Sequence, residues 1–412
     1  MFGSLIQKSV FVLGHPTVFN EGAVNVGRIS EFEGLRAVLC WIVVIGHSFQ
    51  FSGFTNVSTF SVLLAWISWG GHAVNVFVIL SGFVIFLLLD SNSGKTYQQF
   101  MLERFFRIYP IYIVALTIGI ILLPVENVIL RSQWQDPEIA ARGIEVIQSS
   151  YTYFNYHVLS HIFLMQGVVP HEVLPHSSLT LLGLAWSLSL EWQFYIVAPL
   201  LLPLLKRSRS LLISIIFLIA FNLVRKFFTD YNFGFGAFLP LKMEFFTVGM
   251  LSYYGYRFYQ RRGKQSLRSF SILSASVIFI LLIGSFFPSS AVSSRAFPML
   301  LWTIVMSSVT AKVVQIRFAP FDLLNRCLNS SFLQKLGKIS YSTYLLHIAI
   351  IWLLLWLTNL LFPWFDRVGL LIVVIALGFP LVVILSLLLH KFVEKPCISF
   401  GKGVSAKLSH GL

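Results

Sequence analysis

Two ionisable residues, Arg36 and His47, lie on one apolar stretch of the chain. In a helix this spacing returns both side chains to one face, roughly 16 Å apart along the axis. Ionisable groups are costly inside a membrane helix, so two on one face indicate a site. A guanidinium fork suits phosphate, whereas a neutral imidazole can act as a general base or nucleophile. Taken singly, Arg36 also fits a topological anchor and His47 a packing role.

A second pair of cations, Arg104 and Arg107, precedes another apolar segment. At positions i and i+3 of a helix they present neighbouring guanidinium groups. Together with Arg36 they predict three arginines at one mouth, where they would hold the phosphates of a donor. Membrane topology alone would also place arginines at such a position.

Three further polar residues stand inside apolar segments. Glu191 lies about ten residues into its segment, where a bare carboxylate needs a partner or a proton. It could orient His47, hold an acceptor hydroxyl or pair with an arginine. We expect Tyr344 and His347 to lie near the arginine mouth, although packing explains either of them alone.

A group of histidines resembles a metal site only superficially. His157 and His161 are spaced i and i+4, with His171, Glu172 and His176 nearby. This segment is not clearly helical and supplies no defined third ligand, so we expect no metal.

The amino-acid composition indicates the class of protein that positions these residues. The chain has 412 residues, of which 57% are hydrophobic and only 11% charged. A polytopic membrane protein is indicated, since soluble chains carry about 25% charged residues. The basic residues that give the net charge of +14 lie between apolar segments. They therefore indicate the orientation of the chain in the membrane rather than nucleic-acid binding. Three scattered cysteines, Cys40, Cys327 and Cys397, follow no metal or disulfide spacing and are expected to pack.

The predicted fold class is an all-α membrane bundle of about ten transmembrane helices. The segment 60–69 is apolar but short and is expected at the interface or as a re-entrant piece, and 159–169 is ambiguous. The ten predicted spans are 35–54, 73–89, 110–128, 179–205, 211–228, 235–256, 270–287, 297–311, 340–362 and 369–390.

Charge orients these spans. Alternating the loops places most of the 30 Lys and Arg residues on one side, which the positive-inside rule makes the cytoplasm. Both termini are then cytoplasmic. We expect a cytoplasmic segment at 1–27, a membrane domain at 28–396 with a large extracytoplasmic loop at 126–178, and a cytoplasmic tail at 397–412.

Short motifs spread over the chain carry a family resemblance. They are FEGLR at 32–36 followed by His47, FVILSGF at 77–83, RFFRIYP at 104–110, WSLSLE at 186–191, ISYSTYLLH at 339–347 and VEKP at 393–396. In this order and spacing the chain resembles the acyltransferase-three family of integral membrane O-acyltransferases.

The resemblance implies transfer of an acyl group, commonly acetyl, from cytoplasmic acyl-CoA to a hydroxyl of an envelope carbohydrate or lipid-linked sugar. It implies a protein of the bacterial cytoplasmic (inner) membrane. The family's arginine and histidine fall on Arg36 and His47, its arginine pair on Arg104 and Arg107, and its glutamate on Glu191. His47 would take the proton of the acceptor, with an acyl-imidazole intermediate as a variant. A transporter or flippase for a lipid-linked sugar or small anion is the rival hypothesis, and a non-enzymatic assembly protein a third.

Overall fold

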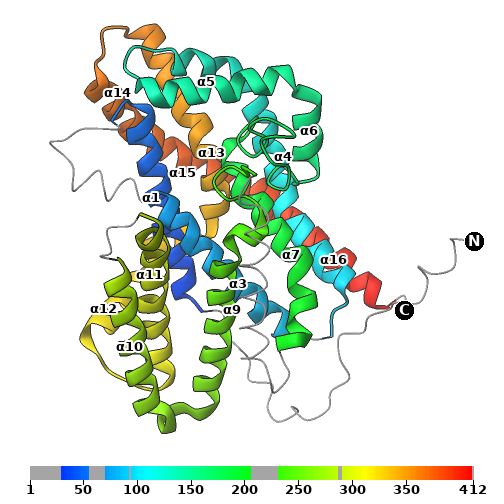
Figure 1. Cartoon of the computed structure of the whole chain (residues 1–412), viewed down its shortest axis with the longest axis vertical. Coiled ribbons are helices and arrows are strands. Elements are labelled where there is room, and N and C mark those ends of the chain that lie inside the picture. Colours follow the sequence, from blue (N-terminus) through cyan, green and yellow to red (C-terminus); the bar gives the residue numbers. More distant parts are fainter. Residues whose placement is uncertain (1–28, 55–69, 92–93, 206–230, 286–289, 411–412) are drawn as a thin grey trace, which may run out of the picture.

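The computed structural model describes residues 29–54, 70–91, 94–205, 231–285 and 290–410. The described residues form helices and connecting turns without a β-strand, as expected for an all-α protein (Figure 1). The predicted segments 1–27, 60–69 and 211–228 fall wholly or almost wholly outside these residues.

The helices follow the chain in this order. They are α1 (Glu31–Phe51), α3 (Gly70–Ser91), α4 (Tyr97–Leu130), α5 (Pro137–Thr152), α6 (Phe154–Ile162), η2 (Gly183–Ala185), α7 (Trp186–Leu205), α9 (Leu239–Arg262), η3 (Gly263–Ser266), α10 (Leu267–Ser285), α11 (Ser290–Val313), α12 (Ala319–Leu328), α13 (Ser331–Leu361), α14 (Arg367–Val373), η4 (Val374–Gly378), α15 (Phe379–Leu389), η5 (His390–Glu394) and α16 (Lys395–His410).

Six of the described helical stretches are long and apolar enough to cross a membrane. They are Glu31–Phe51, Gly70–Ser91, Tyr97–Leu130, Arg295–Val313, Ser331–Leu361 and Arg367–Leu408. The helices α7, α9 and α10 overlap three further predicted spans but are not among the six. The chain is therefore a helical membrane protein, while the count of about ten spans stays a prediction.

The long loop predicted at 126–178 contains two helices. After α4 the chain forms α5 and α6, which lie across one end of the bundle (Figure 1). Gln135, just before α5, donates from Nε2 to the Phe51 carbonyl at 2.7 Å. We call residues 131–182, which contain α5 and α6, the cap. The cap therefore lies over the end of α1 that carries His47.

The helices α1 and α13 run parallel and in close contact. Along their length Glu33 meets Gly337, Cys40 Sγ donates to the Ser340 carbonyl at 3.4 Å, and His47 meets His347. A Cβ atom on Gly337 would lie 2.0 Å from the Glu33 carbonyl oxygen. Small residues allow such approach between membrane helices, and here they fix the register of α1 against α13.

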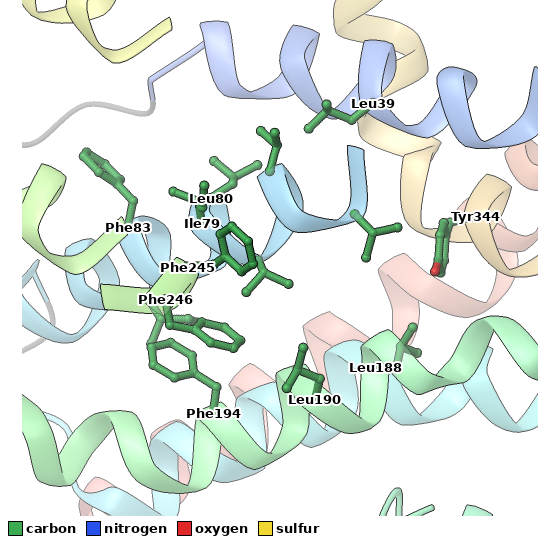
Figure 2. Close-up of a cluster of buried hydrophobic side chains, with 14 of the residues drawn as sticks. Leu39, Ile79, Leu80, Phe83, Leu188, Leu190, Phe194, Phe245, Phe246 and Tyr344 are labelled. Atoms are coloured by element: carbon green, nitrogen blue, oxygen red, sulfur yellow. The ribbon is translucent and has the colours of Figure 1, made fainter. Parts of the chain in front are cut away.

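The helices α3 and α9 also approach closely. A Cβ atom on Gly82 would lie 2.3 Å from the Phe246 carbonyl oxygen. Around this contact Phe246 stacks on Phe194 of α7 with ring centres 4.0 Å apart. Figure 2 shows the buried side chains of α3, α7 and α9 that meet there. This core holds α7, and with it Glu191, against α3.

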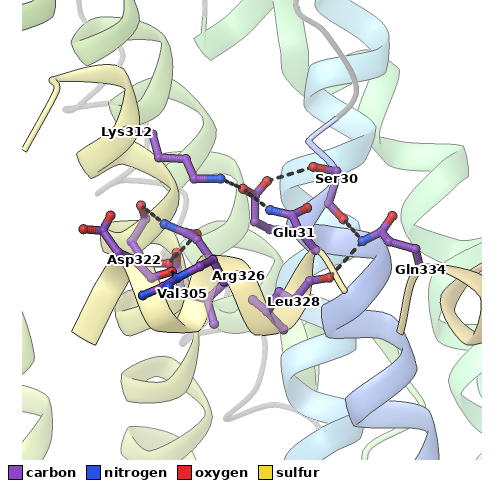
Figure 3. A network of polar contacts seen from close by, with 11 residues as sticks. Ser30, Glu31, Val305, Lys312, Asp322, Arg326, Leu328 and Gln334 are labelled. Carbon is purple, nitrogen blue, oxygen red and sulfur yellow. Dashed lines mark hydrogen bonds and ion pairs between the residues drawn. The ribbon is translucent and has the colours of Figure 1, made fainter. Parts of the chain in front are cut away.

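A polar network fixes the start of α1 (Figure 3). The buried carboxylate of Glu31 accepts hydrogen bonds from Lys312 of α11 and from Asn329 Nδ2, the latter at 2.9 Å. Gln334 of α13 donates to the carbonyl oxygens of Ser30 and Leu328 at 2.7 and 2.9 Å. Three helices thus hold the turn that precedes Arg36.

The variant Gly337→Ala is expected to lower the thermal unfolding midpoint in detergent by several degrees. Its methyl group meets a backbone carbonyl, which can yield only if α1 and α13 separate, and overpacking of this kind costs about 1–3 kcal/mol. The matched control is Gly255→Ala in α9, where a Cβ meets nothing within 4 Å. Equal midpoints for the two variants would contradict the tight α1–α13 contact.

Candidate active site

A cavity of about 880 Å³ lies among α1, α3, α4, α7, α13 and the C-terminal helices. Its size is that of a small-molecule pocket. On α13 its lining runs from Gly337 to Tyr344, roughly 10 Å of helix. The arginine end is the part around Arg36, Arg104 and Arg107, and the tyrosine end is the part around Ser187 and Tyr344.

The structure brings the three predicted arginines into this one cavity. Arg36 Nη1 lies 3.3 Å from Glu33 Oε1. The Arg104 guanidinium lies 5.9 Å from the centre of the Phe100 ring, and its buried Nε has no hydrogen-bond partner in the described part of the chain. Arg107 forms no ion pair within the described part of the chain. Arg104 and Arg107, which form no ion pair among the described residues, favour a bound anion, and their guanidinium forks match phosphate.

The lining at the arginine end carries further charges. Lys95 is paired with Glu103 at 2.8 Å, while Lys338 of α13 and Lys402 of α16 add two cations. The residues predicted as a tail therefore form part of the cavity wall. Gln99 Nε2 holds this helix by donating to the Ser405 carbonyl at 2.9 Å.

Glu191 lies in the same cavity as the arginines. Its Oε1 accepts hydrogen bonds from Tyr195 and from Ser81 Oγ, the latter at 3.2 Å. Of the three roles that the sequence left open, this position fits a group that acts beside the arginines. His47 has a different partner, so the structure does not support orientation of His47 by Glu191.

That partner is His347. Nδ1 of His47 lies 2.9 Å from Nε2 of His347, and the ring centres are 5.2 Å apart. Neither ring lines the cavity. The prediction that His347 lies at the arginine mouth was wrong, because nine residues of helix carry it roughly 14 Å beyond Lys338. Tyr344 does line the cavity, but at its tyrosine end.

The hydrogen bonds assign the protons of this pair. Nδ1 of His347 lies 3.2 Å from the Thr343 carbonyl oxygen, which can only accept, so this nitrogen carries a hydrogen. In a neutral His347 ring Nε2 is then the acceptor, and His47 Nδ1 must donate to it. Nε2 of His47 is left with a free lone pair. Such a nitrogen can take a proton or attack a carbonyl carbon.

Sequence reasoning missed an acid–histidine pair on the cavity wall. His390 Nδ1 lies 2.8 Å from Glu394 Oε2 across the π-helix η5, and Ser342 Oγ donates to the same oxygen at 3.2 Å. The i,i+4 spacing of a histidine and a glutamate after an apolar segment was the available signal. The pair ties the last helices to α13 beside the arginines.

The histidines of the cap have structural partners. His157 lies 3.1 Å from Ser149 Oγ and 3.0 Å from Thr180 Oγ1, and His161 Nδ1 lies 2.9 Å from the Tyr112 hydroxyl. Burial lowers the pKa of His157 to about 4 and that of His161 to about 3, so both rings are neutral at pH 7.

The other candidate ligands, His171 and Glu172, also have hydrogen-bond partners. His171 Nδ1 accepts from the His176 amide at 3.1 Å, and Glu172 accepts from the Asn232 amide at 3.1 Å. Across the described ranges no three His, Cys, Asp or Glu side chains form a group that could hold a metal ion.

These features define a helical membrane protein with a buried, cation-rich cavity next to a hydrogen-bonded histidine pair. A family model described as an acyltransferase domain matches residues 29–391, nearly the whole chain, so the protein belongs to this acyltransferase 3 family. Comparison with curated proteins gave no match. Comparison with solved structures gave none either.

Proposed function

We propose that this protein is a membrane O-acyltransferase that moves an acyl group, in the first instance acetyl, from cytoplasmic acyl-CoA to a hydroxyl of an envelope carbohydrate or lipid-linked sugar. The observation that carries the proposal is the cavity with three arginines at one end and a paired histidine beyond the other. A coenzyme A thioester has the matching form, with phosphates at one end of an extended arm and a reactive carbonyl at the other.

The donor would enter at the arginine end. Its phosphates would contact Arg104 and Arg107, which lack carboxylate partners among the described residues, and Arg36 on α1. The positive charge on this side of the predicted bundle supports a cytoplasmic position for that end by the positive-inside rule. Glu191, hydrogen-bonded to Ser81 and Tyr195, would limit repulsion among the guanidinium groups.

The acyl transfer itself would use His47. Nε2 takes the proton of the acceptor hydroxyl as its oxygen attacks the thioester carbonyl. The carbon–sulfur bond then breaks, and the leaving thiolate takes up the proton held by the imidazolium. His347 and the Thr343 carbonyl keep the His47 ring in the tautomer that this step needs. Direct attack by Nε2 on the thioester, giving an acyl-imidazole, is the variant of the same geometry.

The acceptor would reach His47 from the end covered by the cap. The Phe51 ring lies 5.9 Å from the His47 ring, and around it three buried polar atoms have no hydrogen-bond partner among the described residues. They are Ser52 Oγ, Gln135 Oε1 and Trp352 Nε1. An uncharged set of donors and acceptors beside aromatic rings suits hydroxyl groups better than an ion.

A reconstituted assay tests this function. Purified protein in proteoliposomes receives acetyl-CoA labelled in the acetyl group, with an envelope extract from cells lacking the protein as acceptor. We expect labelled acceptor and free CoA thiol in equal amounts. Thiol release without a labelled acceptor would indicate a hydrolase, and transport of a lipid-linked sugar without thiol release would indicate the flippase.

A further inference from the structure

Tyr344 is the last residue of α13 that lines the donor cavity. This side chain lines the cavity together with Ser187, whereas His47 and His347 do not. The Tyr344 ring centre lies 6.0 Å from that of His347, which in turn bonds to His47. On α13 the tyrosine ring is therefore the part of the cavity lining that lies nearest the histidine pair.

The ring is held in place from the opposite wall. The Tyr344 hydroxyl lies 2.9 Å from Ser187 Oγ and donates to the Leu184 carbonyl at 3.2 Å. These bonds span from α13 to the start of α7, and Figure 2 shows the Tyr344 hydroxyl directed towards α7 near Leu188. Tyr344 is only 8% exposed. It is a fixed wall rather than a loose surface side chain.

We propose that Tyr344 sets the length of the acyl group that the protein transfers. The inference rests on the proposed function, in which the thioester advances from the arginine end. Its acyl group reaches the tyrosine ring before it reaches His347 or His47, so the ring takes the space that a longer chain needs. Close-packed interiors do not yield to extra methylene groups without strain. The predicted substrates are short acyl-CoA thioesters, with acetyl preferred.

The test compares acetyl-CoA, butyryl-CoA and octanoyl-CoA as donors for wild type and Tyr344→Ala. The alanine variant joins the cavity to the space beside His347, so we expect the kcat/KM ratio of octanoyl- to acetyl-CoA to rise at least tenfold. Tyr344→Phe keeps the ring and loses the hydroxyl, and Ser187→Ala removes one hydrogen-bond partner. Both are expected to keep the wild-type ratios.

Three results would overturn this inference. One is an unchanged ratio in a folded Tyr344→Ala protein. Another is an equal change in Tyr344→Phe, since the hydroxyl rather than the ring would then set the length. If the alanine variant does not fold, Tyr344→Leu replaces it, and an unchanged ratio there counts equally. A wild-type protein that uses none of the three donors would instead refute the proposed acyl-CoA function, so the two failures are distinguishable.

Discussion

Replacing His47 with alanine is expected to reduce acyl transfer by about a thousandfold, because general-base catalysis contributes about 10²–10⁴. The loss should appear in kcat, since His47 lies outside the cavity that would bind the donor. Affinity for acetyl-CoA, measured by calorimetry on the protein in detergent, should stay within about twofold. The measurement is the single-turnover rate of labelled acetyl transfer in proteoliposomes. A His47→Ala protein that folds and transfers at the wild-type rate would rule out this base.

The neighbouring histidine provides the matched control. His347→Gln places an amide oxygen where Nε2 accepts from His47, so the tautomer survives and most activity should remain. His347→Leu has similar bulk but no acceptor, and we expect it to lose at least tenfold in kcat. A purely structural role for His347 predicts equal losses in both variants. A further experiment incubates the protein with labelled acetyl-CoA in the absence of acceptor and then denatures it. Label retained on the protein would favour the acyl-imidazole intermediate over general-base catalysis.

The convergence of the arginines could be predicted because its signals are local. Arg36 stands near the start of the first predicted span, and Arg104 and Arg107 precede the third. Because successive spans alternate in direction, the starts of the first and third spans lie on the same side. The cavity that they line follows from this placement. Hydrophobic runs likewise predict helices directly, since the bilayer leaves the backbone few alternatives.

The partner of His47 could not be predicted, because it lies 300 residues away in the chain. The contact depends on the register of α1 against α13, which Gly337 sets by admitting the Glu33 carbonyl. Helical periodicity gives the face of each residue but not the neighbour across a helix pair. The same limit explains why Glu191 was considered for His47, although Ser81 and Tyr195 hold it at the arginines.

The C-terminal segment illustrates a second limit. Its charged residues and few apolar ones predicted a tail beyond 396, yet α16 packs on α4 and places Lys402 in the cavity wall. Phe106 of α4 and Phe400 of α16 meet with ring centres 5.2 Å apart. Short amphipathic segments gain their structure from tertiary packing, which composition does not show.

Arg107→Ala is expected to raise the KM for acetyl-CoA about 30- to 150-fold while kcat changes little. Hydrogen bonds to charged groups contribute about 2–3 kcal/mol, and each 1.4 kcal/mol is a factor of ten. Arg107 should show this clearly, because its guanidinium group forms no ion pair with the described residues. Arg107→Lys keeps the charge but loses the bidentate fork, so an intermediate KM is expected. Arg142→Ala, on the exposed surface of α5, is the control and should leave KM unchanged.

Arg107→Ala is also expected to affect thermal stability differently in the absence and in the presence of CoA. Arg107 forms no ion pair among the described residues, so its removal breaks no direct contact and should leave the thermal midpoint of the free protein nearly unchanged. Stabilisation by added CoA follows RT ln(1 + [L]/Kd) and should shrink as Kd rises. A midpoint that falls without CoA and rises normally with it would show that Arg107 is structural. The phosphate contacts would then have to come from Arg36 and Arg104.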